Sequence, residues 1–239
     1  MPDLAIEIQQ VIYDYQEETF HFDLAVEKGS ITALMGPSGS GKSTLLSLIA
    51  GFIEPKQGNI CVFGSSVVGF APHERPLGML FQEHNLFSHL TVRQNIGLGL
   101  HPGLKLTKEH RQKIEQAAKQ VGLEVLLDRL PEQLSGGQRQ RVALARCFVQ
   151  SHSIWLLDEP FSALDPILRE EMLMLVAKLA QEREVTVLMV THHLTDAKAI
   201  ATHFAFMEQG KVSESGRMSN LDQLHTNAHL AAFIKASGY

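Results

Sequence analysis

One stretch of the chain contains the residue types, at the spacing, of a phosphate-binding loop. The pattern G-x-x-x-x-G-K-[ST] is matched by Gly36-Pro37-Ser38-Gly39-Ser40-Gly41-Lys42-Ser43-Thr44. Glycines let the backbone wind tightly, so that its N–H groups converge on phosphate oxygens, and a helix N-terminus adds partial positive charge there. The Lys42 ammonium can reach the β- and γ-phosphates, and the Ser43 hydroxyl can ligate Mg²⁺. The motif predicts nucleotide binding, although kinases, GTPases and motors share it.

Two carboxylates end an apolar run further along the chain. Asp158 and Glu159 follow Ile154–Leu157 and precede Pro160, which has no N–H and helps to end a strand. Asp158 is expected to hold Mg²⁺ through water. Glu159 is expected to polarise a water molecule for attack on the γ-phosphate. Alone, the pair could be a strand end that meets solvent, but the phosphate loop upstream favours the metal and water roles.

A second glycine-rich segment has the residue types expected of another anion-binding site. It reads Leu134-Ser135-Gly136-Gly137-Gln138 and stands before an expected helix over Arg139–Val149. Ser135 supplies a hydroxyl, the two glycines permit close approach, and the helix would point its N-terminus outward. The alternative is a plain helix cap, where Ser and Gly are common.

Strands that alternate with helices are predicted around these motifs. The strands are Ile31–Met35, Ile154–Leu157 and Val185–Val190, and the helices between them are Lys42–Ala50 and Leu168–Gln181. Such alternation predicts an α/β fold with a mostly parallel sheet and helices on its faces.

The middle of the chain is predicted to be helical. Residues from about 88 to 150 contain no convincing strand; Thr107 can cap one helix, and a second spans about Gln138 to Val149. We expect a single domain over residues 1–239 in which this helical subdomain is inserted into the α/β core. A polar tail beyond Val212 is expected to end in a short helix around Leu221–Ala236.

Composition narrows the class of protein. The 239 residues are 44% hydrophobic and 20% charged, as in an ordinary soluble globular protein, and the net charge of −5 argues against nucleic-acid binding. No apolar stretch approaches 18 residues, and the N-terminus does not resemble a signal peptide, so a cytoplasmic location is expected. Cys61 and Cys147 have no metal-type spacing, which argues against a zinc site or a disulfide scaffold.

The three motifs together resemble the signature set of the ATP-binding cassette (ABC) ATPases. Gln82, Ser162–Asp165 and Thr191-His192 are similar to the family's glutamine loop, aspartate loop and switch histidine, and order and spacing agree along the whole chain. The resemblance implies a P-loop NTPase core, a mostly parallel sheet plus a small antiparallel sheet, with an inserted helical subdomain.

The resemblance also implies a shared reaction centre. Two cassettes would pair head to tail as a homodimer, with each ATP between the phosphate loop of one subunit and Ser135–Gln138 of the other. It implies that Glu159 is the general base and that His192 contacts the γ-phosphate. Gln82 would sense Mg²⁺ and the attacking water, and Asp165 would communicate across the dimer.

An aromatic residue early in such chains stacks on adenine. Tyr13 and Tyr15 are the candidates, and Tyr15 is preferred because of its place before an expected strand over Phe20–Val26. A tyrosine packed in a small sheet remains the alternative for either. This chain departs from many relatives at His193, where an acid or a small polar residue is common, but no motif is lost and hydrolysis remains expected.

Apolar side chains after the glutamine loop suggest a partner. They are spread through a segment that is expected to be a loop and a helix start: Phe81, Leu86, Phe87, Leu90 and Ile96. Such residues predict a docking groove for another protein, which in relatives is a membrane subunit. The alternative is that they anchor the helical subdomain to the core.

The run from Gly78 to Leu106 is similar to bacterial importer ATPases. This implies a peripheral ATPase on the cytoplasmic side of the inner membrane, paired with a transmembrane permease and, through it, with a periplasmic substrate-binding protein. The implied cargo is thiamine; iron, molybdate or polyamine are alternatives. A non-transport cassette in DNA repair or translation, or a small-acceptor kinase, remains as a further alternative, although the coiled-coil insertion and the fused cassettes of such relatives are not seen.

Overall fold

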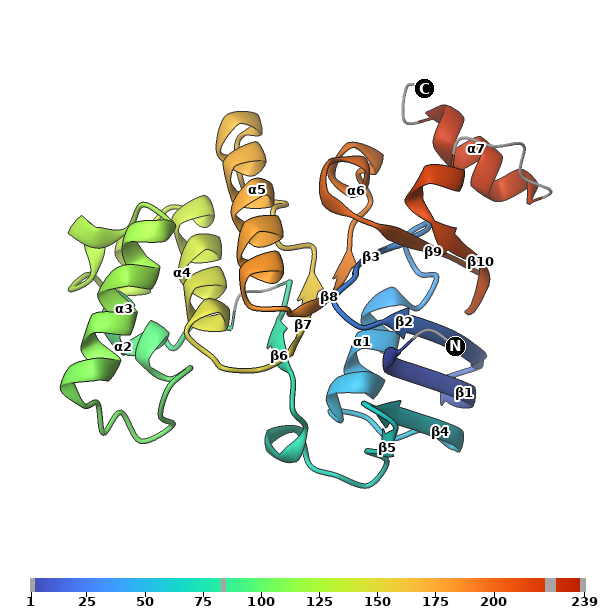
Figure 1. Cartoon of the computed structure of the whole chain (residues 1–239), viewed down its shortest axis with the longest axis horizontal. Helices are drawn as coiled ribbons and strands as arrows, with labels where there is room; N and C mark the ends of the chain where they lie inside the picture. The colour runs from blue at the N-terminus through green and yellow to red at the C-terminus, as the bar shows by residue number, and fades with distance from the viewer. Residues whose placement is uncertain (1–2, 83–84, 222–226, 237–239) are drawn as a thin grey trace.

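The computed structural model describes residues 3–82, 85–221 and 227–236 (Figure 1). Its strands are β1 Leu4–Tyr15, β2 Glu18–Glu27, β3 Ile31–Met35, β4 Gln57–Val62, β5 Ser65–Ser66, β6 Gly78–Leu80, β7 Ile154–Asp158, β8 Thr186–Val190, β9 His203–Glu208 and β10 Lys211–Arg217. Its α-helices are α1 Lys42–Ala50, α2 Val92–Gly97, α3 Lys108–Gln120, α4 Gly136–Phe148, α5 Pro166–Glu182, α6 Leu194–Ile200 and α7 Ala228–Ala236.

All of these strands join one sheet in the order β5-β4-β1-β2-β10-β9-β3-β8-β7-β6. Strands β9, β3, β8, β7 and β6 run parallel to one another, whereas β2, β1, β4 and β5 pair antiparallel. The two parts meet where β10 pairs with β2 through a single parallel register pair, Lys211 with His21. The predicted α/β class, a mostly parallel sheet with a small antiparallel part, is therefore confirmed.

Helices cover both faces of the parallel strands. Because successive strand residues face opposite sides, Trp155 and Leu157 of β7 pack with α4 and α5, while Ile154 and Leu156 pack with α1. In Figure 1, α5 and α6 stand on one side of the strands and α1 on the other. A third cluster joins α6 and α7 to Phe204 and Phe206 of β9. Burial on both faces explains why these strands read as continuous apolar runs.

The region that carries α2, α3 and α4 has no strand in the described residues between 88 and 150. Thr107 caps α3 as predicted, since its hydroxyl accepts a hydrogen bond from the His110 N–H at 3.2 Å. Ile114, Ala117 and Ala118 form the buried face of that helix and pack against the core side of α4. These three helices gather at one end of the molecule (Figure 1).

Several predicted boundaries are wrong. Helix α4 begins at Gly136 and ends at Phe148, so the glycines belong to its first turn. The tail beyond Val212 is not merely polar coil, because β10 continues to Arg217 and pairs with β9. The terminal helix begins at Ala228, and part of the range predicted for it, residues 222–226, lies outside the described residues.

Candidate functional site

The phosphate loop connects the centre of the sheet to α1. Strand β3 ends at Met35 and α1 starts at Lys42, as predicted. Gly36 has a φ of 142°, and a Cβ there would lie 2.1 Å from the carbonyl oxygen of Met207. Gly41 has a φ of 97°, and a Cβ there would lie 2.7 Å from the Phe20 ring. Both positions therefore require glycine, for conformation and for space.

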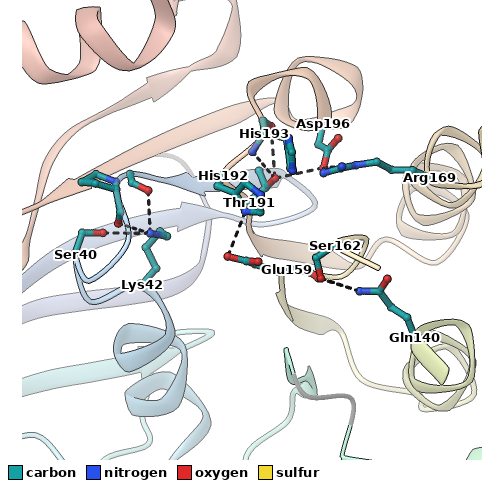
Figure 2. Close-up of polar contacts among 12 residues, drawn as sticks. Ser40, Lys42, Gln140, Glu159, Ser162, Arg169, Thr191, His192, His193 and Asp196 are labelled. Atoms are coloured by element: carbon teal, nitrogen blue, oxygen red, sulfur yellow. Dashed lines mark hydrogen bonds and ion pairs between the residues drawn. The ribbon is translucent and has the colours of Figure 1, made fainter. Parts of the chain in front are cut away.

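The Lys42 side chain lies buried within this loop (Figure 2). Its Nζ donates hydrogen bonds to the carbonyl oxygens of Gly36 at 2.9 Å and Pro37 at 2.7 Å, and lies 3.4 Å from the Ser40 hydroxyl. Burial lowers the pKa of Lys42, while the nearby carboxylates of Glu159 and Asp158 oppose that shift. The loop thus holds a partly desolvated cation, which favours an anionic ligand.

Asp158 lies at the end of β7, with 5% of its surface exposed. Burial raises the pKa of its carboxyl group; Glu159 adds to the shift, whereas a hydrogen bond from Ser43 and the charge of Lys42 oppose it. Within the described part of the chain, its Oδ1 has no hydrogen-bond partner. A buried carboxylate oxygen without a partner, next to a hydroxyl, fits an oxygen-coordinated divalent cation such as Mg²⁺.

Glu159 and His192 meet because they follow neighbouring parallel strands, β7 and β8. The Nδ1 atom of His192 lies 3.3 Å from Oε1 of Glu159 (Figure 2). Glu159 adopts a φ of 47°, a conformation that costs free energy for a residue with a Cβ. Its carbonyl oxygen accepts hydrogen bonds from Gln140 Nε2 at 3.1 Å and Ser162 Oγ at 3.3 Å. Side chains from α4 and the following loop therefore fix the backbone that aims this carboxylate.

A cavity of about 510 Å³ collects most of the predicted residues, a volume suited to a small-molecule ligand. Its lining combines the loop, the catalytic candidates and one edge of β1 and β2: Tyr15, Glu18, Phe20, Gly36, Ser38, Gly39, Gly41, Lys42, Ser43, Thr44, Gln82, Glu159 and His192. Tyr15 is 56% exposed in this cavity, whereas Tyr13 packs against the core cluster of α1. The structure therefore places Tyr15, rather than Tyr13, beside the phosphate loop.

Sequence reasoning missed Glu18 and Phe20 in the lining of this cavity. They lie on β2, where Glu18 pairs with Tyr15 and Phe20 with Tyr13. The signal that could have found them is the hairpin register, because a short turn after Tyr15 brings the start of β2 to the same place.

The second glycine-rich segment stands apart from this cavity in the single chain. Ser135 is the N-cap of α4: its hydroxyl accepts from the Gln138 N–H at 3.2 Å, and Gln138 Oε1 accepts from the Ser135 N–H at 2.9 Å. Gly136 and Gly137 form the first helical turn, and a Cβ on Gly137 would lie 3.1 Å from the Ala163 carbonyl oxygen. The predicted turn is thus a reciprocally capped helix start packed on the loop before α5.

The remaining predicted residues lie around this core. Asp165 caps α5 by accepting a hydrogen bond from the Leu168 N–H at 3.1 Å. In the predicted docking segment, Phe87 is half exposed and the Phe81 ring packs edge-on against exposed Phe52. Ile96 is completely buried, so its assignment to a docking groove is wrong and it anchors α2 to the core.

Fold and cavity together define a phosphate-loop protein built to bind a nucleotide. The family model described as ABC transporter matches residues 20–162, and the chain belongs to this family. It is similar to Thiamine import ATP-binding protein ThiQ of Vibrio parahaemolyticus, with 66% identity over 231 residues that cover 97% of this chain and 99% of that protein. The protein of the same name from Yersinia pestis is 54% identical over 211 residues, covering 88% of this chain and 89% of that one.

Solved structures agree with this family. One is the dimeric structure of a post-hydrolysis state of an ATP-binding cassette bound to ADP and Pi, with a TM-score of 0.81, 30% identity, and coverage of 89% of this chain and 98% of that one. A nucleotide-free cassette from an ABC transporter has a TM-score of 0.85 and covers 97% of this chain and 98% of that one; at 22% identity it supports the fold alone. Within the described ranges, none of the helices combines the length and apolar character that a membrane crossing requires.

Proposed function

We propose that this chain hydrolyses ATP to drive the import of thiamine through a separate membrane permease. The observation that carries the proposal is the 66% identity, over nearly the full length of both chains, to a protein named for thiamine import and ATP binding. The cavity supports the chemical half of the proposal, because a cation, a buried carboxylate and a carboxylate–imidazole pair surround one phosphate loop.

In this proposal the loop residues Gly36–Thr44 bind the phosphates of ATP, and Tyr15 stacks on adenine. The Lys42 ammonium leaves its loop carbonyls for phosphate oxygens, a charge-assisted contact that is stronger than the neutral one it replaces. Ser43 and Asp158 would hold Mg²⁺, and Gln82 lines the same cavity as Ser43. The metal, when bound, supplies neutralisation of phosphate charge.

Glu159 is proposed as the general base. Its carboxylate accepts a proton from the attacking water, whose oxygen bonds to the γ-phosphorus as the bond to the leaving ADP breaks. His192 would orient that carboxylate from 3.3 Å and contact the γ-phosphate. Little covalent chemistry falls to the protein in phosphoryl transfer, so position and charge account for most of the rate. The hydrogen bonds that Gln140 and Ser162 donate to the Glu159 carbonyl oxygen would keep this carboxylate in position.

We further propose that the reaction centre is completed by a second copy. The Ser135–Gln138 start of α4 would face the γ-phosphate of the partner's ATP, and C2 symmetry would supply two such sites. The similar cassette bound to ADP and Pi is described as dimeric, which supports this arrangement. Residues 1–239 would form one cassette, with residues of about 88–150 as its helical subdomain and Asp165 at the dimer contact.

The proposed location is the cytoplasmic side of the inner membrane, through binding to the permease. A periplasmic thiamine-binding protein would deliver cargo to that permease, and no nucleic acid is involved. Exposed Phe87, together with the Phe52–Phe81 pair, supports a docking surface for the permease, because exposed aromatic side chains favour protein contacts.

Uptake of labelled thiamine by cells that lack this gene tests the proposal. We expect uptake to be lost, to return with the wild-type chain or with Glu182→Gln, an exposed control, and not to return with Glu159→Gln. If thiamine uptake persists while uptake of iron, molybdate or a polyamine is lost, the cargo is wrong but the ATPase role stands. If Glu159→Gln restores uptake, the assigned chemistry is wrong.

A further inference from the structure

A largely buried ion pair lies near the proposed catalytic residues, with its carboxylate buried and its guanidinium partly exposed. Arg169 of α5 donates to Asp196 Oδ2 on α6 through Nη2 at 2.5 Å and Nε at 3.1 Å (Figure 2). The side chain of Asp196 is only 4% exposed and that of Arg169 is 19% exposed. Two donors of one guanidinium on one carboxylate oxygen fix the relative orientation of α5 and α6.

The pair reaches the His192 loop through Thr191. The Thr191 hydroxyl lies 3.3 Å from Asp196 Oδ2 and accepts a hydrogen bond from the His193 N–H at 3.1 Å. His192 stands between these two anchored residues. A small cavity is lined by both members of the ion pair and by Glu159 and His192, so the pair lies on the wall of a space that it shares with the proposed catalytic side chains.

The same pair reaches the aspartate loop from the other side. Asp165 caps α5, and the Arg169 N–H donates to the Asp165 carbonyl oxygen at 2.9 Å, one helical turn away. Hydrogen bonds thus run without a break from Asp165 through Arg169, Asp196 and Thr191 to the backbone next to His192.

We propose that the Arg169–Asp196 ion pair is the positioning element that holds His192 against Glu159 and ties that contact to the Asp165 end of α5. The inference rests on the proposed ATPase function and deepens it. Neither residue lines the nucleotide cavity, so neither is a catalytic residue. A buried ion pair is a weak source of stability compared with apolar packing, which makes orientation the better explanation for charges at this place.

The test separates orientation from stability in the full-length chain. Arg169→Met leaves a buried carboxylate without its partner, so we expect Tm to fall by about 6–12 °C. We expect kcat for ATP to fall by about 10- to 100-fold, because small displacements of reacting groups have effects of that size. KM and the affinity for a fluorescent ATP analogue should stay within about twofold of wild type, because no phosphate contact is removed.

The double variant Arg169→Met/Asp196→Asn is decisive, and it remains informative if the single variant fails to fold. Removing both charges should restore most of the lost Tm, while kcat stays low. Lys178→Met is the matched control, because it breaks an exposed ion pair with Glu182 on the same helix and should leave kcat and Tm unchanged.

Three results would overturn the inference. If kcat recovers along with Tm in the double variant, the pair is only structural. If KM or analogue affinity changes instead of kcat, Arg169 contacts nucleotide directly. If the wild-type chain itself does not hydrolyse ATP, the proposed function fails together with the inference, which distinguishes that failure from the other two.

Discussion

Helices α1 and α4 both begin at glycine-rich segments, yet their N-termini are organised differently. The N-cap of α1, Gly41, provides no side-chain acceptor, and the loop before it opens on the cavity of about 510 Å³. The N-cap of α4, Ser135, exchanges two hydrogen bonds with Gln138. The start of α1 therefore has no side-chain cap and borders the cavity, whereas the start of α4 is capped by its own side chains.

The difference lies in what surrounds each helix start. Helix α1 follows the central strand β3; His192 lies just after the neighbouring strand β8, and Asp158 and Glu159 lie at the end of β7, the next strand along. Helix α4 follows a helical stretch and packs on the loop before α5. Of these two glycine-rich helix starts, the one that lines the cavity is the one beside strand ends that supply charged groups, in agreement with the general location of sites in open α/β sheets.

The largest expected effect is on kcat and comes from a residue at the strand ends beside α1. Glu159→Gln removes the proton acceptor but keeps the shape, so kcat should fall by about 10²- to 10⁴-fold while ATP still binds. ATP trapped at α1 should then hold the α4 start of a second copy, and a dimer should accumulate. Steady-state ATPase assays and light scattering after gel filtration measure both results. An unchanged rate would remove Glu159 from its proposed role.

Lys42→Met should weaken ATP binding at the α1 start without changing the α4 start. Loss of a charged hydrogen-bond donor is worth about 1.5–3 kcal/mol, so the Kd for ATP should rise by about 10- to 150-fold. Isothermal titration calorimetry measures the change, with Lys178→Met as the control for loss of a surface charge. Wild-type affinity in Lys42→Met would mean that the loop binds phosphate through its backbone alone.

Tyr15→Ala and Tyr13→Ala compare two side chains on one strand beside α1. Stacking on a base contributes about 1–3 kcal/mol, so Tyr15→Ala should weaken ATP binding by about fivefold or more. Tyr13 packs against the core, so its replacement should lower the unfolding free energy with little effect on Kd. Calorimetric titration and urea unfolding measure the two quantities. The reverse pattern would exchange the roles of the two tyrosines.

Ser135→Ala should remove the N-cap of α4 without changing the α1 start. Loss of the capping hydroxyl should lower the unfolding free energy by about 1 kcal/mol, with the Kd of ATP for the single chain unchanged. Ser135→Thr, which keeps a hydroxyl, is the matched control. Urea unfolding and equilibrium titration measure the two quantities. Weaker ATP binding by the isolated Ser135→Ala chain would mean that α4 already contributes to the site without a second copy.

The smallest expected effect is on the pH dependence of the unfolding free energy, through His193 near α1 and His152 after α4. Burial lowers the pKa of His193, next to the α1 site, with smaller contributions from Arg169 and His192, and burial also lowers the pKa of His152, after α4. As pH falls below the ordinary histidine pKa of about 6.5, the unfolded chain therefore binds protons first, and the unfolding free energy decreases. His193→Asn and His152→Asn should each reduce that slope in urea unfolding between pH 7 and pH 5. An unchanged slope in both variants would mean that other groups control the acid sensitivity.

Local patterns predicted much of the α1 region. The apolar run Ile31–Met35, the glycines and the apolar face of Lys42–Ala50 are adjacent in sequence, so strand, loop and helix lie where they were expected. Asp158 and His192 were also placed correctly at strand ends, because each follows its own buried run.

Features that depend on distant pairing could not be predicted. The start of α4 was placed late because Ser135 and Gln138 cap each other, which favours the helix despite two glycines of low helix propensity. Phe20 enters the cavity only because β2 pairs with β1. Asp196 and Arg169 are 27 positions apart and meet through the packing of α5 on α6, for which neither segment carries a local signal.

Among the described strands, the neighbours with the fewest register pairs are β2 and β10. Strands β2 and β10 share one register pair, and the cavity takes Tyr15, Glu18 and Phe20 from one side of that seam and the phosphate loop from the other. A ligand that fills the cavity would therefore contact both parts of the sheet at once, in addition to the hydrophobic core that they already share through residues such as Phe22 and Leu45.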